Sequence, residues 1–137
     1  MLQVKLRNDT TRGVRFMATI CLYQDTRHEE PLYWIRKMLK LGYISHRNDG
    51  MTELRINGFE KVRNILIDLR PYIRFKAKQV SALMRACTIL EKRRIAELSE
   101  KELRDAVDLV FVIKQENYRS RSALNKDMLL KRLSLTP

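Results

Sequence analysis

Residues 14–24 read VRFMATICLYQ, and apolar side chains occupy every second position along this stretch. The even-numbered positions hold Val14, Phe16, Ala18, Ile20 and Leu22. The odd-numbered positions hold Arg15, Met17, Thr19, Cys21 and Tyr23. Because side chains on a β-strand point alternately to opposite faces, this period of two predicts a strand with one face on a core and the other face polar or basic.

The residues before this strand repeat the same alternation. One parity holds the polar and basic residues Gln3, Lys5 and Arg7, and the other holds Leu2, Val4 and Leu6. Residues 8–13, NDTTRG, have the composition of a turn or a longer hairpin loop. The N-terminal segment therefore predicts a two-stranded ribbon that is apolar on one side and basic or polar on the other.

A helix and a second hairpin are expected next. Asp25 or Thr26 can cap a helix with an acidic first turn at residues 29–31, and Gly42 can stop it. Its apolar stripe consists of Leu32, Ile35, Met38 and Leu39. Two further strands, 43–47 and 51–57, flank the turn sequence Asn48-Asp49-Gly50, which favours a hairpin.

The rest of the chain has helical spacing. Asn57 is a candidate cap for a helix that ends before Pro71. Its inward residues are Phe59, Val62, Ile65, Leu66 and Leu69. Helical spacing returns over residues 80–90, and the capping-box pattern Ser99-x-x-Glu102 starts another helix. Residues 118–132 predict either a basic arm or a short amphipathic helix through Leu129, Leu130 and Leu133. The order ββα, ββα and then helices predicts an α+β fold.

The charge balance indicates a polyanionic partner. The 137 residues include 28 Lys and Arg against 16 Asp and Glu, a formal net charge of +12. Lysine and arginine neutralise phosphates, so we expect nucleic acid first and an acidic membrane surface second.

No apolar run is long enough to span a membrane, and the N-terminus lacks the apolar stretch of a signal peptide, so we expect an intracellular protein. Cys21 and Cys87 have neither CxxC spacing nor a nearby His pair, so we expect no zinc site and no disulfide.

The polar side of the first ribbon can read DNA. A two-stranded ribbon enters the major groove, where Arg or Lys suits guanine and Gln suits adenine. The readers expected from alternation are Gln3, Lys5, Arg7, Arg15, Glu53 and Arg55. A solvated sheet face also carries charge, so the alternation leaves that alternative open.

Three segments resemble a known family. They are TICLYQ at residues 19–24, LGYI at 41–44 and above all LRPYIRFKAKQ at 69–79, and Trp34 lies in the helix between the first two. These segments resemble the LAGLIDADG homing endonucleases, most closely the homodimeric, single-motif kind encoded in organellar introns. The resemblance covers almost the whole chain, and the Leu-x-Pro…Lys-x-Lys-Gln string is its most specific part.

The resemblance implies a fold and a site. The implied fold is αββαββα, with a saddle-shaped antiparallel sheet laid on duplex DNA and a two-fold dimer. This chain supplies ββαββα plus C-terminal helices, with residues 1–117 as the DNA-binding domain and 118–137 as a basic C-terminal segment. The implied catalytic residues are Gln24, Lys76, His28 and Arg27. The resemblance places seven residues on DNA-facing positions: Lys5, Arg7, Arg15, Cys21, Arg47, Glu53 and Arg55. Strand alternation adds Gln3 to the expected DNA-binding residues, and the basic patches add Lys78, Arg119 and Arg121.

The chain differs from the family in the residues that bind the metal. The resemblance implies Mg²⁺ bound by the Asp that ends the LAGLIDADG helix, whereas this sequence starts at Met1, where the first strand is expected, and contains no such motif. Asp9 and Asp25 do not replace that ligand, so we expect no metal ligand in this chain. We therefore expect Mg²⁺-dependent double-strand cleavage, and the homodimer, only when the LAGLIDADG helix is present. We also expect the apolar sheet face to lose part of its cover; its residues are Leu2, Val4, Val14, Phe16, Ala18, Ile20 and Leu22.

Two alternatives remain at this point. One is a catalytically inactive protein that binds DNA or structured RNA, as a repressor, an intron maturase or a ribosome-associated protein. The other is a protein-interaction fragment whose charge serves solubility. By resemblance, the expected compartment is a chloroplast or a mitochondrion.

Overall fold

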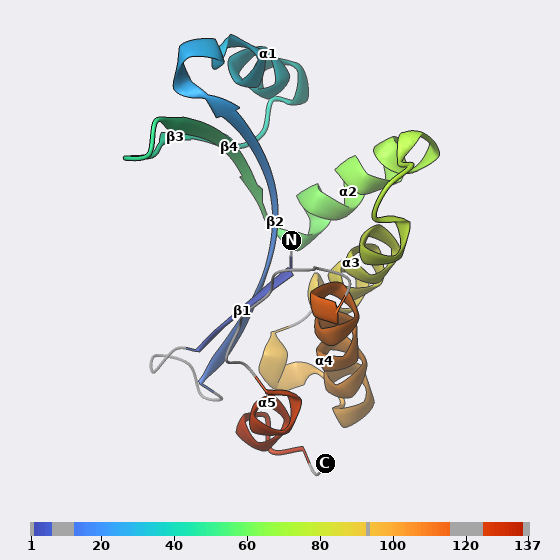
Figure 1. The fold of residues 1–137 in the computed structure, drawn as a ribbon. Helices are drawn as coiled ribbons and strands as arrows, with labels where there is room; N and C mark the ends of the chain where they lie inside the picture. Colours follow the sequence, from blue (N-terminus) through green and yellow to red (C-terminus); the bar gives the residue numbers. More distant parts are fainter. Residues whose placement is uncertain (1, 7–12, 93, 116–124, 136–137) are drawn as a thin grey trace.

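A curved antiparallel sheet organises the computed structural model, which describes residues 2–6, 13–92, 94–115 and 125–135 (Figure 1). The strands are β1 (Leu2–Leu6), β2 (Val14–Asp25), β3 (Tyr43–His46) and β4 (Met51–Asn57). They lie in the order β1-β2-β4-β3, and all three pairs are antiparallel. The two predicted hairpins are confirmed, although β3 ends at His46 and not at Arg47.

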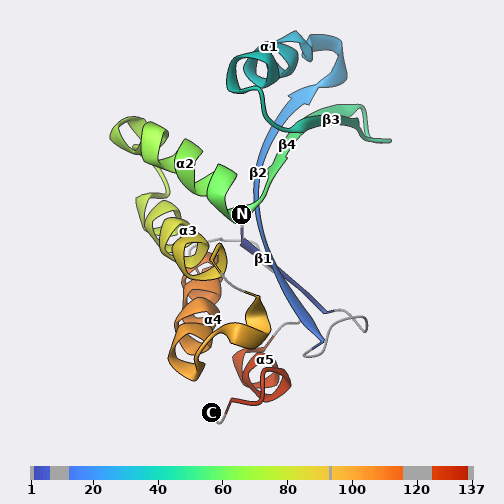
Figure 2. The same cartoon turned by 180° about the vertical axis from the view of Figure 1, so that it is seen from behind.

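The helices gather along one side of this sheet (Figure 1). They are α1 (Glu30–Leu39), α2 (Phe59–Leu69), α3 (Ala77–Leu90), α4 (Glu100–Gln115) and α5 (Lys126–Arg132). Short 3₁₀ turns lie at η1 (Thr26–His28), η2 (Arg70–Tyr72) and η3 (Ile95–Glu97). Both views show α3 and α4 side by side (Figures 1 and 2). In the described part of the chain, the opposite, concave side of the sheet carries no helix.

The larger core lies between β2 and the helices that follow α1. Val14, Phe16 and Ala18 are at most 3% exposed and pack with buried residues of α2, α3, α4 and α5. For these three residues the expected loss of cover is therefore wrong, because the helices that follow α1 supply that cover. Ile20 and Leu22, further along β2, are only half-buried.

A smaller core holds α1 against the other end of the sheet. It consists of Leu32, Leu54, Ile56 and Ile65, with Ile20 in contact with both cores. Two residues of the predicted apolar stripe of α1, Met38 and Leu39, are exposed. They lie in the last turn, and the helix ends as Lys40 takes a left-handed conformation at φ 52°.

The ends of the helices show which capping signals hold. Ser99 and Glu102 form the predicted capping box, since the Glu102 carboxylate accepts from Ser99 N at 2.8 Å and Glu102 N donates to Ser99 Oγ at 3.2 Å. Asn57 is not a cap, because it belongs to β4 and Gly58 takes the N-cap position of α2. Asp25 caps the 3₁₀ turn η1, and α1 starts only at Glu30.

The described part of the C-terminal segment joins the larger core. The Asn125 side chain caps α5 by accepting from Asp127 N at 3.0 Å. The buried residues of this segment are Leu129, Leu130, Leu133 and Leu135. For residues 126–132 the amphipathic helix is the right alternative. The domain boundary at 117/118 falls outside the described residues and stays a prediction.

Candidate nucleic-acid interface

The odd-numbered residues of the four strands share one face of the sheet, here called the polar sheet face. Lys5 pairs with Arg15 between β1 and β2. A second row runs across three strands through Cys21, Arg55 and Tyr43. A third row contains Tyr23, Glu53 and Ser45. Since strand register puts directly opposed residues on the same face, the residues predicted from alternation do lie together.

This face is open at its basic positions. Lys5 and Arg15 are exposed, Gln3 and Cys21 are half-buried, and the Arg55 side chain is 38% exposed. It coincides with the concave side that carries no helix in Figure 1. Arg7, Arg119 and Arg121, also predicted to bind DNA, lie outside the described residues. The described part therefore presents basic side chains along β1 and β2 and at the centre of the sheet.

Glu53 lies on the polar sheet face but is 3% exposed. Its Oε1 accepts a hydrogen bond from Arg55 Nε, and this bond is the main cause that raises the pKa of Arg55. Its other oxygen, Oε2, is buried without a hydrogen-bond partner in the described structure. Glu53 is therefore a buried carboxylate held by one arginine, and in the protein alone its atoms do not face solvent.

Neighbouring side chains tie the polar sheet face together. Thr19 Oγ1 donates to Asn57 Oδ1 at 2.8 Å, and Asn57 Nδ2 lies 3.5 Å from the Tyr43 hydroxyl. The guanidinium of Arg47 lies over the Tyr23 ring, 5.9 Å from its centroid. A hydrogen bond with Cys21 is the main cause that raises the pKa of Tyr23. The face is thus ordered by contacts between strands.

Sequence reasoning missed Tyr43 and Asn57 as members of this face. The signal was present, because Asn57 has the same parity as Glu53 and Arg55 in the predicted strand 51–57. Placing Tyr43 required the register of β3 on β4, which the turn sequence alone does not give. Sequence reasoning also missed an open pocket of about 340 Å³ beside α1, whose basic lining residues are Arg36, Lys37 and Lys40.

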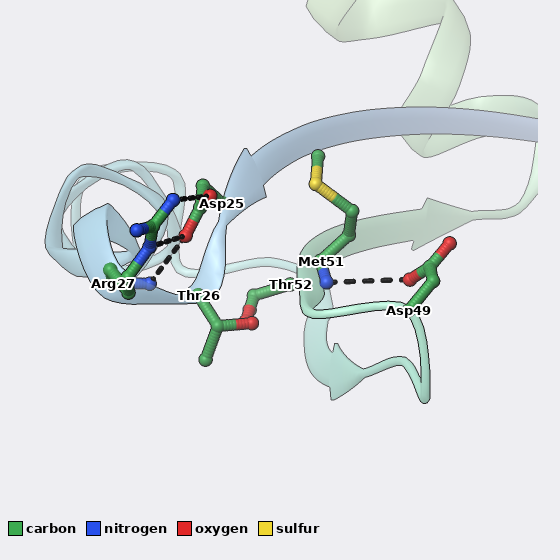
Figure 3. Close-up of polar contacts among 6 residues, drawn as sticks. All are labelled: Asp25, Thr26, Arg27, Asp49, Met51 and Thr52. Atoms are coloured by element: carbon green, nitrogen blue, oxygen red, sulfur yellow. Dashed lines mark hydrogen bonds and ion pairs between the residues drawn. The ribbon is translucent and has the colours of Figure 1, made fainter.

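Three of the four predicted catalytic residues lie where β2 meets η1. Gln24 is half-buried at the end of β2 and pairs with Thr52. Arg27 donates to both carboxylate oxygens of Asp25, at 3.0 and 2.8 Å, and its backbone N donates at 2.9 Å (Figure 3). These bonds hold the pKa of Asp25 well below its usual range. His28 ends η1 with an exposed side chain.

A polar network joins this junction to β3 and β4. The hydroxyls of Thr26 and Thr52 lie 3.0 Å apart, and Figure 3 shows the two side chains facing each other. Thr52 Oγ1 donates to Glu29 Oε2 at 2.6 Å, and His46 Nε2 lies 2.8 Å from the same oxygen. The bond from Thr52 is the main cause that lowers the pKa of Glu29. The network fixes η1 and the start of α1 on the hairpin of β3 and β4.

Lys76 lies on a different segment, between η2 and α3. Its side chain is exposed and its backbone is left-handed, with φ 59°, at the N-cap position of α3. In the described part of the chain, no hydrogen bond or ion pair joins Lys76 to Gln24, Arg27 or His28. A left-handed backbone is uncommon for residues other than glycine, and such conformations gather at functional sites. Lys78, also predicted to contact DNA, is exposed in the first turn of α3.

The described residues do not fit a magnesium site. They contain no group of three His, Cys, Asp or Glu side chains that could hold a metal. Near Gln24, both Asp25 oxygens are engaged by Arg27, and Glu29 Oε2 is engaged by Thr52 and His46.

Two further observations concern cysteines and membranes. Both cysteines are free, and burial raises the pKa of Cys87 to about 11, which makes its thiol a poor nucleophile. Within the described ranges, no helix combines the length and the apolar character needed to cross a bilayer.

Comparison with known proteins gives one sequence relative. The DNA endonuclease I-CvuI of Chlorella vulgaris is 28% identical over 82 residues, which are 60% of this chain and 51% of I-CvuI. The chain thus matches about half the length of this curated relative. No protein-family model matches the chain.

Solved structures match over nearly the whole chain. I-CvuI in complex with a DNA target, in the presence of Mg and with the DNA not cleaved, has a TM-score of 0.85 at 22% identity and covers 99% of this chain and 86% of its own. An archaeal intron-encoded homing endonuclease complexed with DNA has a TM-score of 0.81 at 18% identity, covering 97% and 84%. The LAGLIDADG homing endonuclease I-SmaMI, bound to cleaved DNA, has a TM-score of 0.75 at 16% identity, covering 100% of this chain and 45% of its own. These likenesses confirm the predicted fold.

Proposed function

We propose that this chain, which resembles the LAGLIDADG homing endonucleases and has their fold, is a homing-endonuclease protomer or fragment that binds a specific, pseudo-palindromic DNA duplex. The observation that carries this function is the polar sheet face, where Lys5, Arg15 and Arg55 lie on a concave surface that no helix of the described ranges covers. The similar structures named above were solved in complex with DNA. By resemblance, the expected compartment is a chloroplast or a mitochondrion.

The polar sheet face suits a duplex chemically. Side chains two residues apart along a strand point the same way, so Gln3 and Lys5 are spaced to reach successive base edges or phosphates. Arginine donates to guanine and glutamine to adenine, whereas lysines neutralise phosphates and release counterions. The net charge of +12 supports the electrostatic part of binding.

Cleavage is proposed only for a form that includes a LAGLIDADG helix. The resemblance assigns the Mg²⁺-binding Asp and the dimer contact to that helix, and the printed sequence contains no such motif. The same resemblance assigns Gln24 a place near the scissile phosphate and Lys76 a role in offsetting transition-state charge. The exposed, left-handed position of Lys76 supports that role.

The engagement of Asp25 favours a second candidate function. Because both oxygens of this carboxylate bind Arg27, the residues beside Gln24 are arranged for structure and not for holding a metal. The chain would then bind nucleic acid without cutting it, as a repressor, an intron maturase or a ribosome-associated protein. Binding of structured RNA would distinguish an intron maturase or a ribosome-associated protein from a DNA-binding repressor.

Selection from a randomised duplex library tests the proposed function. The chain is incubated with the library, with and without Mg²⁺, and the bound duplexes are sequenced. We expect one pseudo-palindrome of about 20 bp to be enriched, since a two-fold dimer reads two half-sites. We expect cutting only from a version that carries a grafted LAGLIDADG helix. Failure to enrich any duplex, or equal or tighter binding of structured RNA, would contradict duplex recognition.

A pair of charge-matched variants locates the binding surface. Lys5→Ala with Arg15→Ala removes two charges from the polar sheet face, and Lys92→Ala with Lys101→Ala removes two from exposed positions near the ends of α3 and α4. The first variant should weaken duplex binding and reduce the slope of log K against log salt by about two, one for each lost phosphate contact. The second should change neither quantity. Equal effects of the two variants would place binding elsewhere.

A further inference from the structure

Arg55 lies at the centre of the polar sheet face. It belongs to β4, an inner strand, and Cys21 of β2 and Tyr43 of β3 lie directly opposite it. Its side chain is 38% exposed, so the guanidinium reaches solvent on the polar sheet face. Arginine with two parallel donors free is the side chain best suited to O6 and N7 of guanine.

Glu53 is a buried side chain that hydrogen-bonds to Arg55. It precedes Arg55 by two residues on the same strand face, and its side chain is 4% exposed. Its Oε1 accepts from Arg55 Nε, and its Oε2 has no partner among the described residues. In the described structure, Arg55 is therefore the one hydrogen-bond partner of this buried carboxylate.

This arrangement restrains the guanidinium. If Arg55 moved away, Glu53 would be left as a buried charge without a partner, which is strongly unfavourable. The bond uses Nε and leaves Nη1 and Nη2 for a ligand. Because the side chain is ordered before DNA arrives, less conformational entropy is lost on binding. The burial of Glu53 also keeps its own oxygens away from base edges.

We propose that Glu53 is a positioning residue, which holds Arg55 in place to recognise guanine at one base pair and does not itself contact a base. This role rests on the duplex binding proposed above. It replaces the sequence-based expectation that both side chains are readers, and it assigns the buried carboxylate to specificity through Arg55.

The first test uses the protein without DNA. In nitrogen-detected NMR, the Nε–H proton of Arg55 should exchange with solvent more slowly than that of Arg47, whose bond to Asp49 is made by Nη2. In Glu53→Gln, which keeps the side-chain size, the Arg55 exchange should become faster. Equal exchange of the two arginines in the unsubstituted protein would overturn the restraint.

The second test reads base preference from library selection. Arg55→Ala and Glu53→Gln should each lower the preference for guanine by about tenfold or more, at one and the same position of the half-site. The double variant should lose no more than Arg55→Ala alone. Asp108→Asn is the matched control, because it removes a carboxylate from an exposed ion pair with Lys126, between α4 and α5 and away from the polar sheet face, and should leave every base preference unchanged.

The charge change separates positioning from general binding. Glu53→Gln and Asp108→Asn each remove one negative charge, so both should bind non-specific duplex more tightly. Only Glu53→Gln should lose guanine preference at the same time. A changed preference at a different position would make Glu53 a direct reader, and no change at any position would remove its role. Both outcomes overturn the positioning role while leaving duplex binding intact, whereas enrichment of no duplex by the unsubstituted chain overturns both.

Discussion

Replacing Gly42 by alanine should destabilise the protein because the new methyl group has no room. Gly42 lies just before β3 with φ +89°. A Cβ there would lie 2.7 Å from the carbonyl oxygen of Arg55 and 2.9 Å from side-chain carbons of Leu54 and Ile56. The oxygen belongs to the backbone of β4 and cannot rotate away, so the strand itself must shift.

Three contributions determine how much Gly42→Ala lowers the free energy of unfolding. A left-handed backbone costs an alanine about 1–2 kcal/mol. Overpacking against a fixed neighbour adds about 1–3 kcal/mol. The smaller conformational freedom of alanine in the unfolded chain returns about 0.4–1 kcal/mol. Gly42→Ala should therefore lower the free energy of unfolding by about 2–4 kcal/mol.

Gly50→Ala is the matched control. Gly50 also has a positive φ, +76°, but a Cβ there meets nothing within 4 Å. This variant keeps the backbone cost without the clash and should lose only about 1 kcal/mol. Urea unfolding of the three proteins, followed by circular dichroism, measures the difference. If the two variants lost equal stability at equal m values, the steric reasoning would be refuted.

Two further outcomes follow from the capping box and from the network around Glu29. Ser99→Ala removes the capping hydroxyl and should lower the free energy of unfolding by about 1 kcal/mol. Ser81→Ala, inside α3, is the control and should not lower it. Thermal unfolding of the two variants measures the difference. The pKa of Glu29 lies below its ordinary value of 4.5, so its stabilisation is present above pH 4.5 and is lost as the pH falls through the lowered pKa. As the pH falls below 4.5, the free energy of unfolding should therefore decrease less in Glu29→Gln than in the unsubstituted protein, as measured by urea unfolding at each pH. Equal decreases in the two proteins would argue against the network.

Much of the fold could be predicted from local pattern. The alternation over residues 14–24 and the Asn48-Asp49-Gly50 turn determine strands and a hairpin, and both are local signals. Met38 was placed inward because helical spacing shows which side chains align but not where the neighbouring elements stop. The cover over Val14 and Phe16 was underestimated because it depends on helices more than 60 residues away in the chain.

For the candidate site, the sequence predicted which side chains share a face but not which of them are buried. Strand parity alone brought Lys5, Arg15 and Arg55 to one face. The burial of Glu53 was not predictable, because it arises from side chains on neighbouring strands whose register the sequence does not state. The relation of Lys76 to Gln24 was inferred from resemblance, and in the described structure they belong to separate segments without a direct contact.

The unequal size of the two cores determines how the molecule opens. The cluster that holds α1 on β3 and β4 has four buried residues in the described part of the chain, far fewer than the cluster under α3 and α4. Regions with few buried apolar contacts open locally at lower free energy than the rest, so the amides of β3 should exchange with deuterium before those of α4. Arg55 and Glu53 are carried by this less protected end of the sheet. A duplex bound there would slow exchange in β3 and β4, because binding stabilises the closed state, and would leave α4 unchanged.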